Sequence, residues 1–98
     1  MKIFWTDVAA KHLAAIHTYI ATSSPVYAAQ LIRRIQIRTD QLEHFPESGR
    51  PTPEGVDHGV REVFERPYRI MYRIKNAQVE IVAVIHMRQL TPDLGPGT

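Results

Sequence analysis

The 98-residue sequence contains no cysteine, which excludes a disulfide scaffold, a zinc ribbon and a cysteine nucleophile. It also lacks an apolar run near the roughly 18 residues that span a bilayer. Residues 1–5 have neither the charged region nor the long apolar region of a signal peptide. We therefore expect a cytoplasmic protein without a membrane partner.

Motifs for metal, phosphate and nucleophilic chemistry are missing as well. The sequence has no HExxH motif, no Gly-rich phosphate loop and no Ser/His/Asp motif. The histidines are scattered, and His12 and His17 lie five residues apart, which places them poorly for one helix face. No cofactor and no metal ligand are expected.

Lysine is scarce, because nine of the 12 basic residues are arginine. The formal net charge of +2 is weak evidence for a nucleic-acid partner, but its distribution is uneven. Six of the 12 basic residues lie between positions 61 and 88. The planar guanidinium fits carboxylates and phosphates, so this region is expected to face an anionic partner.

Apolar periodicity predicts a strand and two helices in the first half. The short aromatic segment 2–5 is typical of a strand. A helix over 7–21 follows from an apolar stripe with spacings of four, three and four, and Thr6 or Asp7 is its expected cap. A second helix begins at Pro25 behind the cap Ser24 and runs to about residue 44. The short break predicts an antiparallel helical hairpin.

The second half changes to the period of strands. Residues 46–60 hold three prolines and three glycines and are expected to form a loop. Strict alternation over 68–75 predicts a strand with a basic outer face. With segments 60–65 and 78–87, and a turn at residues 76–77, it forms an antiparallel three-stranded meander.

This element order, β-α-α-β-β-β, predicts an α+β fold. The hairpin must bury its apolar stripe, and the apolar face of the small, mainly antiparallel sheet is the surface large enough for it. A single domain is expected over residues 1–90. Residues 91–98 lack periodicity and are expected to form a flexible tail.

A set of residues in this order resembles a known family. The pattern comprises Trp5-Thr6, Ala10, Leu13, Ile16, Tyr19-Ile20, Pro25, Ala28-Ala29, Leu42, Pro46, Gly49-Arg50, Arg61, Tyr68-Arg69-Ile70, Tyr72, Val79, Val84-Ile85-His86 and Arg88. Over about residues 1–90 it is similar to the RelE/ParE toxin superfamily of bacterial type II toxin–antitoxin systems, on the ParE side.

The resemblance implies one of two activities. ParE-like members inhibit DNA gyrase by binding, without a catalytic reaction of their own, whereas RelE-like members cut messenger RNA on the ribosome. Both are neutralised by an antitoxin whose C-terminal segment wraps around the toxin. The expected partners are therefore a ParD-like antitoxin, in a hetero-oligomer, and DNA gyrase, with the ribosome and messenger RNA as the alternative target.

The residues favour the binding toxin over the nuclease. Metal-independent RNA cleavage needs a base, cations on the phosphate and an acid, for which the candidates are Arg61, Arg73, His86 and Arg88. No lysine lies between residues 11 and 75, and the loop 46–60 is acidic. We therefore expect no catalytic residues. A third possibility is an inactive relative that only binds antitoxin.

The expected site residues each have a structural alternative. Target binding is assigned to Arg61, Arg69, Arg73, His86 and Arg88, and antitoxin binding to Val26, Leu31, Arg69 and Arg73, the first two as exposed residues of the helical hairpin. Alternatively, His86 is a hydrogen-bonded structural histidine, Arg69 and Arg73 form a solvated face, and Arg61 anchors a carboxylate within the fold. Arg50 is expected to reach a carbonyl, and Trp5 and Tyr19 are expected to pack between helices and sheet.

Overall fold

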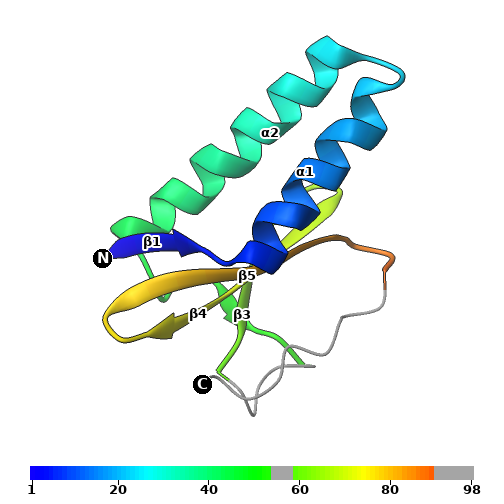
Figure 1. Ribbon diagram of the computed structural model, residues 1–98. Coiled ribbons are helices and arrows are strands. Elements are labelled where there is room, and N and C mark those ends of the chain that lie inside the picture. Colours follow the sequence, from blue (N-terminus) through cyan, green and yellow to red (C-terminus); the bar gives the residue numbers. More distant parts are fainter. Residues whose placement is uncertain (54–58, 90–98) are drawn as a thin grey trace.

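The computed structural model describes residues 1–53 and 59–89, so the expected tail at 91–98 lies outside the described residues. The elements are β1 (Lys2–Trp5), α1 (Asp7–Ala21), α2 (Pro25–Asp40), the short 3-10 helix η1 (Gln41–Glu43), β2 (Arg50–Pro51), β3 (Arg61–Glu65), β4 (Tyr68–Lys75) and β5 (Gln78–His86). Figure 1 shows the helical hairpin lying against the sheet, which confirms the α+β prediction. No helix in the described ranges is long and apolar enough to cross a membrane.

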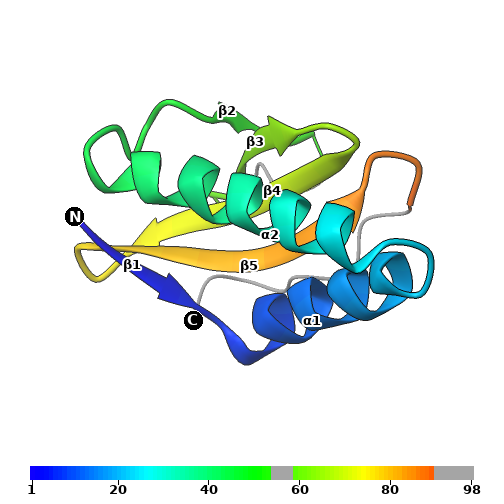
Figure 2. The same ribbon diagram turned by 90° about the horizontal axis from the view of Figure 1, so that it is seen from above.

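The sheet has five strands in the order β1-β5-β4-β3-β2. β1 pairs with β5 in parallel, and the other neighbours are antiparallel, as expected of a mainly antiparallel sheet. Seen from above, α2 lies over β4 and β5, while α1 lies beside β5 beyond the end of β1 (Figure 2). The fifth strand, β2, was not predicted, because its two residues sit in a proline-rich loop and carry no period.

Hydroxyl side chains start both helices. Thr6 Oγ1 accepts the amide hydrogen of Ala9 at 3.2 Å and donates to the Ile81 carbonyl at 2.8 Å, so one residue caps α1 and ties it to β5. Ser24 Oγ accepts from the amide of Tyr27 at 3.2 Å, as predicted. α2 ends at Asp40, earlier than predicted, because the next three residues tighten into η1.

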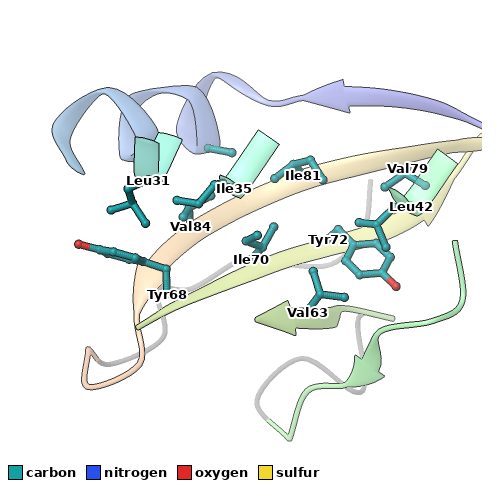
Figure 3. Packing of buried hydrophobic residues seen from close by; sticks show 11 residues of the cluster. Leu31, Ile35, Leu42, Val63, Tyr68, Ile70, Tyr72, Val79, Ile81 and Val84 are labelled. Atoms are coloured by element: carbon teal, nitrogen blue, oxygen red, sulfur yellow. The ribbon is translucent and has the colours of Figure 1, made fainter. Parts of the chain in front are cut away.

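The main core lies between the helices and the sheet (Figure 3). Leu31 and Ile35 of α2 face Ile70 on β4 and Val84 on β5. The expectation that Leu31 is an exposed hairpin residue is wrong, since only 1% of it is exposed. Its position on the helical stripe, three and four residues from Ala28 and Ile35, explains its burial.

The opposite sheet face is less solvated than predicted. The register of β4 with β5 shifts at Met71/Tyr72, where Met71 pairs with Ala83 and Tyr72 pairs with Ile81. Val82 falls between these pairs and forms a bulge. A second buried cluster, comprising Val60, Met71, Val82, Ala83 and Ile85, therefore occupies the middle of the face that was expected to be basic. Arg73 is buried as well.

Candidate partner-binding surfaces

Glu62 organises an ion-pair cluster on the sheet face away from the helices. Its carboxylate is buried, and its Oε1 binds Arg69 Nη2 at 2.7 Å while its Oε2 binds Arg50 Nε at 2.6 Å. Arg69 is only 12% exposed along its side chain. The alternative that Arg69 belongs to a solvated face is therefore wrong, because Arg69 neutralises a buried carboxylate.

Arg61 was expected to bind a carboxylate and Arg50 a carbonyl, but in the structure each has the partner expected for the other. Arg61 Nη1 donates to the carbonyl of Gly49 at 2.8 Å, whereas the expected carboxylate partner belongs to Arg50. β2 and β3 pair Arg50 with Glu62, which brings the Arg50 side chain to the carboxylate. Arg61 thus holds the backbone of the loop that precedes β2.

The same loop is fixed from the core by Tyr72. Its hydroxyl donates to the Pro46 carbonyl at 2.7 Å and accepts the amide hydrogen of Gly49 at 2.9 Å. Burial raises the pKa of Tyr72, so the hydroxyl keeps the proton that it donates. Together with Arg61, Tyr72 places Gly49 close against β3 and β4.

His86 and Arg88 lie at the end of β5. The His86 ring meets the Tyr68 ring edge-on at 5.6 Å, and its Nδ1 accepts from the amide of Arg88 at 3.1 Å. The His86 amide donates to Gln89 Oε1 at 2.6 Å. These contacts correspond to the structural alternative for His86, while the Arg88 side chain is exposed.

The candidate target-binding residues therefore do not gather into one catalytic cluster. Arg61 binds a carbonyl and Arg69 a carboxylate, while Arg73 faces Glu80 across the β4–β5 pair. His86 accepts a backbone hydrogen bond instead of holding its Nδ1 toward solvent. Within residues 1–53 and 59–89, no group of three His, Asp or Glu side chains is placed to hold a metal ion.

An apolar groove of about 340 Å³ runs between the two helices. Ala10 and Ala14 of α1 lie one turn apart, and their small side chains leave room above Leu13 and Ile32. Trp5, His17 and Gln36 complete the lining. The groove was not predicted as a site, although the two alanines on one helix face are the sequence signal that could have found it.

Further exposed aromatic and aliphatic residues lie near the tip of the hairpin. Val26 is 69% exposed, as expected of a candidate antitoxin contact. Tyr19 is 79% exposed, so its expected packing between helix and sheet is wrong. Tyr19 and Tyr27 line a second hollow of about 420 Å³ at the turn between the helices. Apolar side chains exposed together on one element are typical of a protein-binding surface.

His12 joins α1 to the edge of β5 through a hydrogen bond, and its burial predicts that stability depends on pH. Its Nδ1 accepts the amide hydrogen of Val84 at 3.2 Å, and burial lowers its pKa below the ordinary value of 6.5. The folded chain therefore takes up the proton less readily than the unfolded chain. We expect the stability present above pH 6.5 to decrease as the pH falls below that value.

Thermal unfolding followed by circular dichroism at pH 7.5 and 5.5 measures this effect. His12→Asn supplies a neutral acceptor oxygen at a similar position and is expected to reduce the difference between the two midpoints. His17→Asn is the matched control, since His17 is exposed. An equal pH dependence in the His12 variant and the parent would contradict the assignment.

The structure is a small α+β domain with a helical hairpin that exposes apolar side chains and an apolar groove. A family model described as the ParE toxin of the type II toxin–antitoxin system, parDE, matches residues 3–91. The chain belongs to this ParE toxin family, which confirms the resemblance seen in the sequence, and its partner is an antitoxin.

A solved structure of a toxin–antitoxin system is also similar to this chain. The chain is 27% identical to a protein in the structure titled "Chromosomal ParDE TA system from P. aeruginosa", with a TM-score of 0.74. The match covers 88% of this chain and 95% of that chain. No curated protein matches the sequence.

Proposed function

We propose that this toxin inhibits DNA gyrase by binding it, without chemistry of its own, and that a ParD-type antitoxin neutralises it in a hetero-oligomeric complex. The observation that carries the proposal is the engagement of two candidate nuclease side chains, Arg61 and His86, in the fold. Arg61 anchors Gly49, and His86 accepts the hydrogen bond of the Arg88 amide.

RNA cleavage would need side chains that this fold already uses. A general base must reach the ribose hydroxyl, and cations must reach the scissile phosphate. Recruiting Arg61 for these tasks would leave the carbonyl of the buried Gly49 without its partner, at a cost of about 1–3 kcal/mol. The geometry of the described residues thus favours binding over RNA cleavage.

The groove between α1 and α2 supports the antitoxin part of the proposal. An amphipathic helix that enters such a groove places apolar side chains at every third or fourth residue into it. Leu13 and Ile32, one from each helix, line the groove together with Ala10 and Ala14 of α1. Val26 lies near the start of α2, at the hairpin tip, and is our proposed contact there.

Arg88 is our proposed contact with gyrase among the residues assigned to target binding. It is exposed, and the contact shown for it is made by its backbone amide. Arg88→Gln is therefore expected to preserve the fold and weaken inhibition about tenfold or more, since charged hydrogen bonds contribute about 1.5–3 kcal/mol. Arg33→Gln on the exposed side of α2 is the control with the same charge change.

A supercoiling assay with purified gyrase tests the proposal. Added toxin is expected to inhibit supercoiling and to increase the amount of cleaved DNA held by gyrase, and antitoxin is expected to reverse both effects. A parallel reaction with translating ribosomes is expected to leave messenger RNA intact. Unimpaired supercoiling together with cut messenger RNA would identify a nuclease, and no effect in either reaction would identify an inactive relative.

A further inference from the structure

A polar hollow of about 320 Å³ opens on the sheet face away from the helices. Three arginines line it, namely Arg50 of β2, Arg66 of the β3–β4 turn and Arg69 of β4, together with Glu62 and Phe64 of β3. Among the described lining residues, Glu62 is the one acidic side chain. This set of three guanidinium groups around one carboxylate is called the arginine hollow below.

Glu62 serves the arginine hollow as an anchor. Each of its two oxygens binds an arginine, one Arg50 and the other Arg69, so both oxygens are engaged within the fold. Arg50 makes its ion pair through Nε, at the inner side of the guanidinium, while 68% of its side chain is exposed. One negative charge therefore fixes two positive ones, and the described lining keeps an excess of positive charge.

Phe64 holds the outer guanidinium groups in place. The guanidinium carbon of Arg50 lies 5.1 Å from the centre of the ring, and that of Arg66 lies 6.0 Å from it. Both distances are within the range of cation–π attraction. Arg66 Nη1 also reaches Met87 Sδ at 3.7 Å, a weak contact. Both guanidinium groups contact this one ring, so each is partly ordered before any ligand arrives, which lowers the entropy lost on binding.

We propose that the arginine hollow binds a phosphate of a nucleic-acid backbone. A phosphodiester offers two acceptor oxygens at tetrahedral angles, so it accepts from guanidinium groups that arrive from different segments, here Arg50 and Arg66. Both oxygens of Glu62 bind arginines, so the proposal is one of phosphate binding and includes no cleavage step. The inference is independent of gyrase inhibition, because it concerns the protein and the nucleic acid alone.

The test measures binding of the full chain to a short fluorescent DNA duplex and to a single-stranded RNA of equal length, by anisotropy at several salt concentrations. Arg66→Gln is expected to weaken binding about tenfold and to reduce the slope of log affinity against log salt by about 1. Arg50→Lys keeps the charge but loses the planar fork, so weaker binding is also expected. The matched control is Arg33→Gln, on the exposed side of α2.

Thermal unfolding of each variant establishes that it is folded. Arg66→Gln is less expected to destabilise the fold than Arg50→Lys, because Arg66 contacts Phe64 and Met87 and not the buried carboxylate of Glu62. A preference for the duplex or for the single strand identifies which nucleic acid supplies the phosphate. Three results would overturn the proposal: no saturable binding to either probe, equal weakening by Arg33→Gln, or displacement of the nucleic acid by a glutamate-rich peptide at equal concentration.

Discussion

Ala14→Arg is expected to weaken antitoxin binding about a hundredfold while leaving the free toxin folded. Ala14 is exposed and lines the groove between α1 and α2, where the proposed antitoxin helix lies. Arginine is a good helix former, so α1 tolerates it. Its side chain would fill the groove and bring a charge against the apolar face of the partner helix.

Ala15→Arg is the matched control for this prediction. Ala15 is also exposed on α1, but it lies outside the groove lining. Calorimetric titration of each variant with the cognate antitoxin measures the difference. The variant at position 14 is also expected to keep its inhibition of gyrase in the presence of antitoxin. If Ala14→Arg binds antitoxin as tightly as Ala15→Arg does, the antitoxin helix lies elsewhere.

Gly49→Ala is expected to reduce the free energy of unfolding by roughly 3 kcal/mol. A Cβ atom at position 49 would lie 2.6 Å from the Tyr72 hydroxyl and 2.7 Å from the carbonyl oxygen of Glu62. Tyr72 is fully buried and cannot move aside, so the loop must shift. The shift weakens the hydrogen bonds of Gly49 with Tyr72 and Arg61.

Urea unfolding of Gly49→Ala and of Ser48→Ala measures this effect. Ser48 is the neighbouring exposed residue, and its substitution is expected to change stability by less than about 0.5 kcal/mol. Tyr72→Phe removes the hydroxyl and is expected to cost about 1–3 kcal/mol, because Gly49 and Pro46 lose their buried partner. Equal stability of Gly49→Ala and the parent would show that the loop is not held against the core.

The helices and long strands of this fold could be predicted because their signals are local. The apolar stripe of α1 and the caps Thr6 and Ser24 depend on neighbouring residues alone. The turn at Asn76 and Ala77 follows from the alternation on either side of it, and both residues adopt positive φ, of 53° and 57°. Such backbone conformations are typical of two-residue hairpin turns.

Features that depend on distant pairing could not be predicted in the same way. The two residues of β2 become a strand only because β3 lies beside them. The bulge at Val82 arises from the register between β4 and β5, and the alternation of β4 alone does not reveal it. The buried second cluster around Met71 follows from that pairing.

The partners of the site residues also depend on strand pairing and could not be predicted from the sequence. The sequence identified Arg50, Arg61 and Arg69 as residues with an anionic or carbonyl partner, but the partners depend on strand register. Pairing of Arg50 with Glu62 assigns the carboxylate to Arg50 and leaves the loop carbonyl to Arg61. Val26 was correctly expected to be exposed, whereas Leu31, five residues further along α2, faces the sheet.

The most direct test of the central claim is induced expression of the toxin without antitoxin, with plasmid topology and messenger RNA integrity measured in the same cells. We predict growth arrest, loss of negative supercoiling in the plasmid and intact messenger RNA. Growth arrest with normally supercoiled plasmid and fragmented messenger RNA would contradict the claim that this toxin acts by binding gyrase.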